Sequence, residues 1–382
     1  MIRILTAGES HGPALVGILE GMPAGVRIGE RAINRELARR QMGYGRGGRM
    51  QIERDRAEIL SGVRFGESIG SPIALLIPNR DFLHWQERMA KAGPKSGPPF
   101  TRPRPGHADL AGALKYGRLD ARDILERASA RETAMRVALG ALAKILLARI
   151  GIQVLSHVVA LGGVVAKEVP VGPGDLARID RSPVRTADPL AELAMIAAID
   201  RAKEAGDTLG GLVEVVAFGA PVGLGSHAHY DRRLDARLAG AMVSIPAIKG
   251  VEVGDAFWSA GQVGSAVHDP IHFQAGQGFT RPSNRAGGIE GGISNGQPIR
   301  ARVAMKPLSS LRRPLESADL VSHQPFDAQV ERSDVVALPA AGVVAEAVMA
   351  LTLASAVTEK FGADTLVELM RAKRAYERRL PR

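Results

Sequence analysis

The sequence predicts an α+β fold, and three observations support that class. Of the 382 residues, 45% are hydrophobic and 24% are charged, which is the composition of a globular protein with a substantial core. Short apolar runs typical of strands are mixed with segments of helical apolar spacing. The two kinds of segment do not alternate regularly, as a doubly wound parallel sheet would require.

The apolar spacing predicts these elements in the first half of the chain: strands at 2–7, 14–19, 57–64 and 71–77, and helices at 29–41 and about 120–150. The polar turn GESHGP separates the first two strands. The first helix is expected to stop before Gly43, and the second should bury one face. Between them, residues 92–106 hold five prolines and three glycines, so we expect an irregular loop.

The elements expected in the second half are strands at the start of 152–190 and at 210–218, 250–253 and 299–305, and helices at 191–205, 232–245 and about 340–361. Residues 160–190 are rich in proline, glycine and aspartate, and we expect a mobile insertion of variable sequence there. Residues 363–382 are expected to form a charged tail beyond the ordered core.

Membrane insertion and secretion are not expected. The apolar stretch Val343 to Val357 contains Glu346 and falls short of the ~20 residues that a membrane span needs. The N-terminal segment lacks the pattern of a secretory signal, so a cytoplasmic location is expected. Without cysteine, the chain has no disulfides, thiolate metal sites or cysteine nucleophiles.

The net charge of +10 favours an anionic ligand. Arginine supplies 40 of the 50 cationic residues, and its planar guanidinium suits bidentate binding of phosphate and carboxylate. The cations are spread along the chain and aromatic residues make up only 4%, which argues against nucleic-acid binding. The histidines show no metal-ligand spacing, and surface placement is expected for His84, His157 and most others.

The turn GESHGP carries the first candidate site residues, Ser10 and His11. Flanking glycines let a ligand approach the backbone, and an imidazole can exchange a proton near neutral pH. A solvated histidine is the alternative. A Ser–His nucleophile pair is not expected, because adjacent residues on an extended chain point to opposite faces.

Arginines recur on two further glycine-rich or proline-rich segments. Arg40, Arg46 and Arg49 lie within ten residues, where the alternative is a solvated basic loop without the spacing of a P-loop. The loop TRPRPGH holds Arg104 and His107 rigidly.

Four later segments add candidate groups. Ser129 and Arg131 begin a buried helix, whose N–H groups favour phosphate. The other candidates are five glycines within 287–296, and the polar residues Lys306, Ser309, Ser310, Arg332 and Asp334.

Taken together, these segments resemble the chorismate synthase family. The motifs that carry the resemblance are GESHG, GYGRGGRMQIERDRAEILSGV, GSPIALLIPNRD, RPGHADLAGALKYGRLDARDILERASARETA, GDTLGG, SIPAIKGVEVGDAF, SNRAGGIEGGISNGQPI, KPLSS and RSDVVALPAAGVVAEAV. They cover roughly 300 residues in the same order.

The resemblance implies a lyase that converts 5-enolpyruvylshikimate 3-phosphate to chorismate by 1,4-anti elimination of phosphate. It implies reduced FMN as cofactor, without net redox change, and a place in the shikimate pathway of aromatic amino-acid biosynthesis. It also implies a single-domain β–α–β sandwich with internal pseudo-duplication, assembled as a homotetramer.

Site residues follow from the same resemblance. His11 is similar to the family histidine near the leaving phosphate, His107 to the one near flavin N1, and Asp334 to the base that takes a proton from flavin N5. The implied substrate ligands are Ser10, Arg40, Arg46, Arg49, Arg104, Ser129, Arg131 and Arg332. The implied FMN contacts are Ser129, Ala130, Arg131, Pro246, Ala247, Gly291, Lys306, Pro307, Leu308, Ser309, Ser310 and Arg332. Pro246 cannot donate a backbone N–H, so its contact would be apolar or through a carbonyl.

Two alternatives stay open. One is a basic RNA-binding or scaffolding protein on the same fold, against which the intact His11, His107 and Asp334 argue. The other is a synthase with an added NAD(P)H-dependent flavin reductase activity, where otherwise an external system must reduce the FMN.

Overall fold

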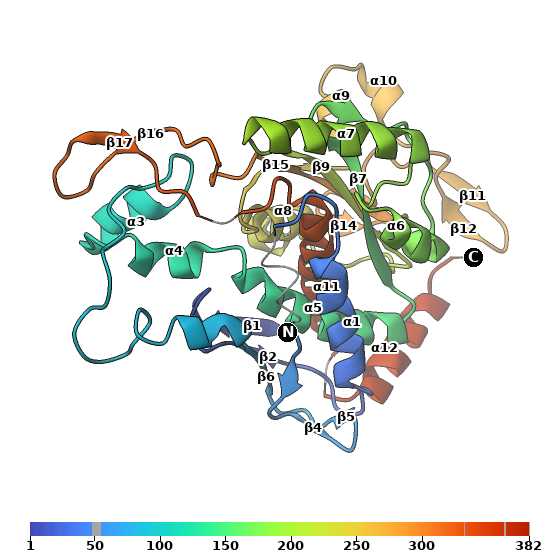
Figure 1. Ribbon diagram of the computed structural model, residues 1–382. Coiled ribbons are helices and arrows are strands. Elements are labelled where there is room, and N and C mark those ends of the chain that lie inside the picture. The colour runs from blue at the N-terminus through green and yellow to red at the C-terminus, as the bar shows by residue number, and fades with distance from the viewer. Residues whose placement is uncertain (48–54, 332, 363, 382) are drawn as a thin grey trace.

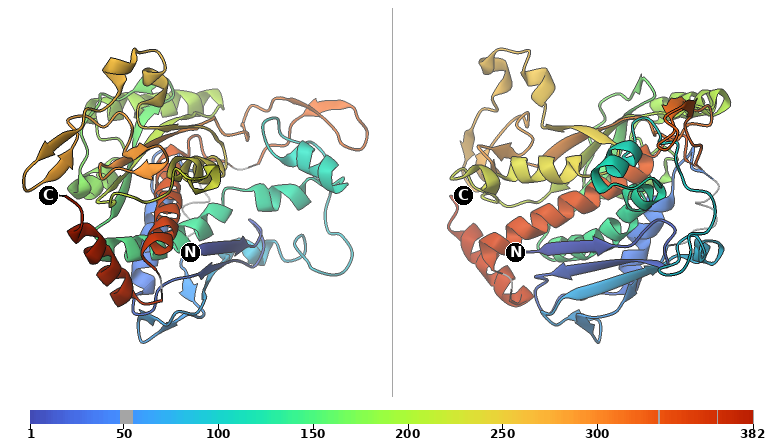
Figure 2. Two further views of the ribbon diagram at one scale, coloured as in Figure 1. Left: turned by 180° about the vertical axis from the view of Figure 1, so that it is seen from behind. Right: turned by 90° about the vertical axis from the view of Figure 1, so that its left-hand side faces the viewer.

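Two antiparallel sheets lie on either side of a layer of helices (Figures 1 and 2). The computed structural model describes residues 1–47, 55–331, 333–362 and 364–381. In the right-hand view of Figure 2 the N-terminal strands form the lower layer, the long helices the middle and the later strands the upper layer. This arrangement confirms the α+β class and the sandwich. The internal pseudo-duplication stays a prediction.

The N-terminal sheet has four strands in the order β1-β2-β6-β3. Their bounds are β1 (Arg3–Ala7), β2 (Ala14–Glu20), β6 (Ile73–Pro78) and β3 (Glu58–Ile59). Alternate residues of β6, Ile73, Leu75 and Ile77, are fully buried, whereas the residues between them are more exposed. This period of two places one face of the sheet against the helices.

The second sheet has five strands in the order β10-β15-β9-β7-β8. Their bounds are β10 (Ile248–Val253), β15 (Ile299–Met305), β9 (Gly211–Phe218), β7 (Gln153–Leu161) and β8 (Val164–Val165). On β15, Ile299, Ala301 and Val303 are buried and alternate with partly exposed residues. The strands at 210–218, 250–253 and 299–305 are therefore confirmed.

Three long helices fill the space between the sheets: α1 (Glu30–Gln41), α5 (Glu132–Arg149) and α11 (Leu338–Phe361). Helix α5 contacts the N-terminal sheet and α11 contacts β7 and β9. The two helices touch at Gly140, where a Cβ atom would lie only 2.3 Å from the Cβ of Ala347. Glycine at this position thus allows the backbones of α5 and α11 to approach closely.

Further helices surround this sandwich. They are α3 (Asp109–Tyr116), α4 (Arg122–Ala128), α6 (Leu176–Arg181), α7 (Pro189–Ala205), α8 (Leu234–Val243), α9 (Ala256–Ser259), α10 (Gly264–Val267) and α12 (Leu366–Arg378), with 3₁₀ turns η1 (Arg80–His84), η2 (Pro173–Asp175) and η3 (Tyr230–Arg232). The small hairpins are β4 (Val63–Arg64) with β5 (Glu67–Ser68), β11 (His272–Gln274) with β12 (Gly278–Thr280), β13 (Ile289–Glu290) with β14 (Ile293–Ser294), and β16 (Glu316–Ala318) with β17 (Pro325–Asp327).

Helices α3 and α4 and the hairpin β16–β17 form an arm to one side of the sandwich (Figure 1). Phe100, Ala121 and Leu125 form a small hydrophobic cluster there, with Leu320 packed against it. The arm has no other core in the described residues. Its proline-rich segment 92–106 contains neither helix nor strand, as expected.

One buried carboxylate ties the layers together. Glu346, in the middle of α11, is fully buried and accepts hydrogen bonds from Arg39 at 2.7 and 3.0 Å and from Arg185 at 3.0 Å. Lys144 and Ser156 also donate to it. Burial alone would raise the pKa of Glu346, but the charges of Lys144, Arg39 and Arg185 outweigh it and hold that pKa well below its ordinary value.

Several expectations about these elements were wrong. The helix expected over 120–150 is interrupted, because Ser129 adopts an extended conformation between α4 and α5. The ordered core does not end near 361. Helix α12 occupies the expected tail, buries Leu366 and Leu369, and packs on α11 through an edge contact of Tyr376 with Phe361.

The segment 160–190 contains β8, η2 and α6, and it places Val184 and Arg185 in the protein interior. That its sequence varies stays a prediction. Helix α11 is long and apolar enough to cross a membrane, contrary to the expectation from Glu346. However, 94% of its apolar window is buried inside the protein, as in the core helix of a globular domain.

Candidate active site

The turn between β1 and β2 presents Ser10 and His11, and both are buried. Asn79 stabilises the turn, because its side-chain amide donates to the carbonyls of Ser10 at 3.2 Å and Gly12 at 2.8 Å. The Ser10 N–H donates to the carbonyl of Glu126 at 2.9 Å. The turn is therefore docked on the end of helix α4.

Glu126 fixes the imidazole of His11. Its carboxylate accepts from the backbone N–H of His11 at 2.8 Å and lies 2.8 Å from His11 Nδ1. Trp85 stacks on the imidazole with a centroid distance of 3.8 Å. Burial would raise the pKa of Glu126, but hydrogen bonds and charge from His11 and the charge of Arg122 lower it. Glu126 is thus an ionised acceptor at neutral pH.

Two arginines gather at the break between α4 and α5. Arg40 donates from Nε to Thr133 Oγ1 at 3.0 Å and from Nη2 to the carbonyl of Ala130 at 2.9 Å. Arg131 Nη1 lies 3.1 Å from Asp55, and Arg40 Nη1 lies 3.8 Å from the same carboxylate. Two buried guanidinium groups therefore converge at this break, and guanidinium groups suit phosphate and carboxylate oxygens.

The two serines of the candidate set meet at this group. The hydroxyls of Ser129 and Ser10 lie 3.1 Å apart, and Ser129 precedes the first turn of α5. The prediction that Ser129 and Arg131 mark the start of the buried helix is confirmed. The structure therefore brings Ser10, His11, Ser129 and Arg131 to one place.

Arg46 and Asp334 form a second part of the site. Arg46 Nη1 lies 3.0 Å from Asp334 Oδ2, and the backbone N–H of Gly47 donates to Asp334 Oδ1 at 2.6 Å. Among the described residues, the buried Nε of Arg46 has no hydrogen-bond partner. A buried donor without a partner is costly, which favours an acceptor from a bound ligand.

Arg104, His107 and Asp109 form a third part. Asp109 is fully buried and accepts from His107 Nδ1 at 2.5 Å and from Arg104 Nε at 2.8 Å. Burial alone would raise the pKa of Asp109, but the hydrogen bonds from His107 and Arg104 outweigh it and lower the pKa to about 2. Arg104 Nη1 donates to Ser310 Oγ at 2.7 Å, which connects this loop to the segment 306–310.

The segment 306–310 lies opposite Gly106. A Cβ atom on Gly106 would lie 3.6 Å from Lys306 Nζ and 3.8 Å from Ser309 Cβ. Burial and the like charge of Lys249 lower the pKa of Lys306, so two lysine side chains lie near each other at this segment. Lys306 N donates to the carbonyl of Ala247 at 3.0 Å, which places the Pro246–Ala247 segment beside it.

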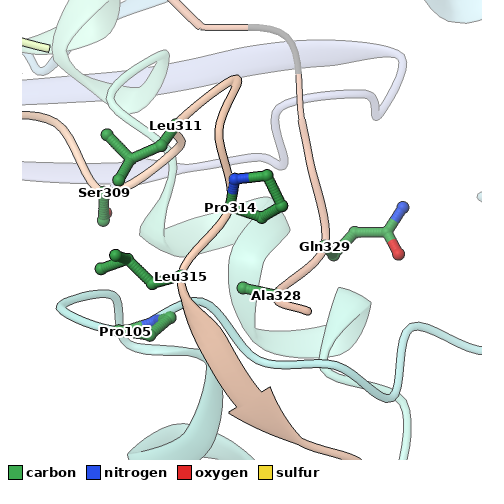
Figure 3. A pocket seen from close by; sticks show the side chains of 7 residues that line it. All are labelled: Pro105, Ser309, Leu311, Pro314, Leu315, Ala328 and Gln329. Carbon is green, nitrogen blue, oxygen red and sulfur yellow. The ribbon is translucent and has the colours of Figure 1, made fainter. Parts of the chain in front are cut away.

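A pocket at this junction is shown in Figure 3, and its lining residues are Pro105, Ser309, Leu311, Pro314, Leu315, Ala328 and Gln329. Its volume is about 10 Å³, which holds about one water molecule. A larger ligand would therefore lie on the open face of these loops rather than inside this pocket.

Phe100 connects the first and third parts. The guanidinium of Arg122, which also lies 3.0 Å from Glu126, is 5.9 Å from the Phe100 ring centroid. The guanidinium of Arg104 is 5.8 Å from the same ring. Ser333 Oγ donates to the carbonyl of Ser310 at 2.7 Å, so the residue before Asp334 contacts the third part as well.

Some expected residues are not joined to this constellation. Gly291 lies in the β13–β14 turn, whose described backbone contacts go to Leu234 and Gly225. Arg49 and Arg332 lie outside the described residues. His157 was expected at the surface, but it is buried and its Nε2 lies 3.3 Å from Glu214.

Sequence reasoning missed the acidic partners Asp55, Asp109 and Glu126, and also Trp85. Asp109 could have been suspected, because it follows His107 by two residues in the motif HAD. Among the described residues, no group of three or more histidines, aspartates or glutamates could hold a metal ion.

Comparison with known proteins identifies the family. Residues 2–358 match the family model described as chorismate synthase. The chain is 57% identical to the chorismate synthase of Desulforudis audaxviator, over 100% of this chain and 98% of that protein. It is also 57% identical to that of Moorella thermoacetica, over 100% of this chain and 99% of that protein. A crystal structure of chorismate synthase superposes with a TM-score of 0.80 at 43% identity, covering 98% and 97% of the two chains. The chain belongs to the chorismate synthase family.

Proposed function

We propose that this lyase of the shikimate pathway eliminates phosphate from 5-enolpyruvylshikimate 3-phosphate in a 1,4-anti reaction that yields chorismate. The observation that carries the proposal is the convergence of two buried guanidinium groups, those of Arg40 and Arg131, beside the hydroxyls of Ser10 and Ser129. Guanidinium groups suit the phosphate and the two carboxylates of this substrate. Arg46, whose Nε has no hydrogen-bond partner among the described residues, and Arg104 would bind further anionic oxygens.

The family uses reduced flavin, and the residues of this chain fit FMN by their chemistry. Lys306, with Lys249 nearby, would pair with the phosphate of FMN, and Ser309 and Ser310 would add hydroxyl donors. The family pattern would add Ser129, Ala130, Arg131, Pro246, Ala247, Gly291, Pro307, Leu308 and Arg332. When bound, reduced FMN would supply transient electron transfer to a reaction that is redox-neutral overall.

Proton transfer would then fall to three side chains of this chain. His11 would donate a proton from Nε2 to the departing phosphate, because its Nδ1 faces Glu126. His107 would stabilise negative charge on the reduced cofactor, since Asp109 fixes its Nδ1. A carboxylate oxygen of Asp334 would accept the proton that the elimination releases. Arg46 and the backbone N–H of Gly47 orient this carboxylate.

The test is anaerobic incubation of purified protein with the substrate and photoreduced FMN, followed by assays of chorismate and of released phosphate. We expect both products in equal amounts. Failure to form chorismate with intact substrate binding would overturn the proposed reaction. A parallel arm with oxidised FMN and NADPH decides whether the chain reduces its own flavin or depends on an external reducing system.

We propose further that the chain is one domain that assembles as a homotetramer in the cytoplasm. A tetramer with twofold axes needs two different self-complementary surfaces. Two separate surfaces expose apolar side chains. One is the segment 257–279, which exposes Phe257, Ile271 and Phe279. The other is a groove of about 780 Å³ between β1, α8 and α11, beside the exposed Leu5 of the edge strand β1.

Light scattering coupled to size-exclusion chromatography measures the assembly directly. Phe279→Glu, which adds a charge to the first surface, should halve the tetramer to a dimer, whereas a monomeric parent protein would contradict the proposed assembly.

A further inference from the structure

The carboxylate of Glu126 makes three contacts at once inside the protein. The residue is 3% exposed. Its Oε2 accepts from the backbone N–H of His11 at 2.8 Å, its Oε1 lies 2.8 Å from His11 Nδ1, and Arg122 Nη1 donates to Oε1 at 3.0 Å. One carboxylate therefore holds both the main chain and the ring of His11, which constrains the ring more than a single hydrogen bond would.

The plane of the His11 ring is held separately. Trp85 stacks on it at a centroid distance of 3.8 Å and an interplanar angle of 29°. Trp85 is held in turn, because its Nε1–H donates to Asp81 at 3.1 Å and Arg122 lies 5.1 Å above its ring. The edge and the face of the imidazole thus both have defined partners.

The chemistry of these partners determines where the proton of the imidazole sits. An ionised carboxylate can only accept a hydrogen bond, so His11 Nδ1 must carry a hydrogen. The exchangeable site for a reacting group is then Nε2. The carboxylate also balances the positive charge that the ring carries when it is ready to donate a proton.

We propose that Glu126 is a positioning residue for proton donation by His11: it fixes the Nδ1–H form and directs Nε2 to the leaving group. This inference rests on the proposed role of His11 in the elimination. Further charged groups around the pair, among the described residues, are Arg122, which also contacts Glu331, and Asp81 and Arg88 at Trp85. Arg122 keeps Glu126 ionised and so supports the same proton arrangement.

The primary test compares Glu126→Gln with the parent enzyme in the anaerobic assay. We expect kcat to fall about 10²-fold, between the 10-fold typical of a lost supporting group and the 10⁴-fold of a wrong tautomer. KM for the substrate should change less than about 3-fold, because the described contacts of the Glu126 carboxylate go to His11 and Arg122, not to the arginines proposed to bind the substrate. The pH profile of kcat should shift, since the ring loses its balancing charge.

A matched control comes from the second buried pair of this kind. Glu214 lies 3.3 Å from His157 in the five-stranded sheet and is 8% exposed. Glu214→Gln should lower the unfolding temperature as Glu126→Gln does, but leave the pH profile of kcat unchanged. Equal changes of the profile in both variants would show a general loss of stability and overturn the proposal.

The outcomes also separate this inference from the proposed function. If His11→Ala keeps the parent rate, the role of His11 is wrong and the inference fails with it. If His11→Ala is slow but Glu126→Gln keeps the parent rate, only the inference fails. The double variant should be no slower than His11→Ala alone, whereas additive losses would show that Glu126 acts independently.

If Glu126→Gln does not fold, two measurements decide. Glu126→Asp keeps a carboxylate and should retain part of kcat. Nitrogen NMR of the parent protein should show a protonated Nδ1 in His11, and a predominant hydrogen on Nε2 with a bare Nδ1 would overturn the proposal.

Discussion

His11 and His107 are each paired with a buried carboxylate, but the two carboxylates have different further partners. In each, Nδ1 faces a buried carboxylate, Glu126 at 2.8 Å from His11 and Asp109 at 2.5 Å from His107. Glu126 also accepts from the backbone of its own histidine. Asp109 instead shares its carboxylate with Arg104, which reaches Ser310 on another segment.

This difference separates what each pair can affect. The His11 pair contacts Trp85 and, through Arg122, Glu331, but it has no described contact with the segment 306–310, so its loss should act mainly on proton donation. The His107 pair is linked through Arg104 to the segment 306–310, so its loss should also disturb whatever that segment binds. Substitutions in the His11 pair should therefore lower mainly kcat. Substitutions in the His107 pair should also weaken ligand binding.

The largest effect is expected for His11→Ala and His107→Ala. Each should lower kcat by about 10²–10⁴-fold, the range for a positioned proton-transfer group. His11→Ala should leave FMN affinity unchanged, whereas His107→Ala should weaken it. Flavin titrations under substrate-saturated conditions measure this, and equal flavin affinities in the two variants would remove the contrast.

Asp334→Asn should lower kcat about 10²-fold, because an amide keeps the shape of the side chain but cannot accept the proton. It should also loosen Arg46, which lies 3.0 Å from the carboxylate, so substrate affinity should weaken moderately. Anaerobic turnover at the parent rate would show that another group or solvent takes the proton.

Asp109→Asn should have an intermediate effect, mainly on binding. Arg104 loses its charged partner and should no longer hold Ser310, so FMN affinity should fall about 10-fold. Flavin absorbance titrated with and without substrate measures this. FMN should bind more tightly with substrate in the parent protein, and equal affinities there would contradict coupling between the two ligands.

The smallest effect concerns stability in acid. The pKa of Asp109 is lowered to about 2 in the folded state, below its ordinary value of 3.8. Its carboxylate therefore stabilises the protein above pH ~4, and that contribution of about 2 kcal/mol is lost as the pH falls toward 2. Denaturant unfolding at several pH values measures this. The free energy of unfolding should fall less steeply with decreasing pH in Asp109→Asn than in the parent, and parallel pH dependences would contradict the prediction.

Much of the architecture was predictable because long apolar patterns dominate it. The strand at 299–305 and the helices α1 and α7 agree with their spacing within two residues. Helix α12 was missed, since only Leu366 and Leu369 are buried in an otherwise charged segment. The break at Ser129 was missed, because the contact of Ser129 with Ser10, 119 residues away, is visible only in the fold.

The site was predictable only in part, for a related reason. Its arginines and histidines stand out on glycine-rich and proline-rich loops. Their acidic partners are ordinary residues in sequence, and only the fold shows that Asp55 lies between Arg40 and Arg131. Glycines such as Gly291 stand out equally, but the turn of β13–β14 accounts for that residue, whose φ is +57°.

The carboxylate of Glu346 has a consequence for the order in which the chain folds. Its partners lie far ahead of it in sequence: Arg39 precedes it by 307 residues, Lys144 by 202 and Arg185 by 161. A chain emerging from the ribosome therefore completes α1, α5 and β7 while three cations destined for the interior still lack their common anion. Packing these elements earlier would bury three cations against two carboxylates, Glu36 and Asp180, which is unfavourable. The charges of the middle layer are balanced only after residue 346 has been made, so closure of that layer should follow the synthesis of α11.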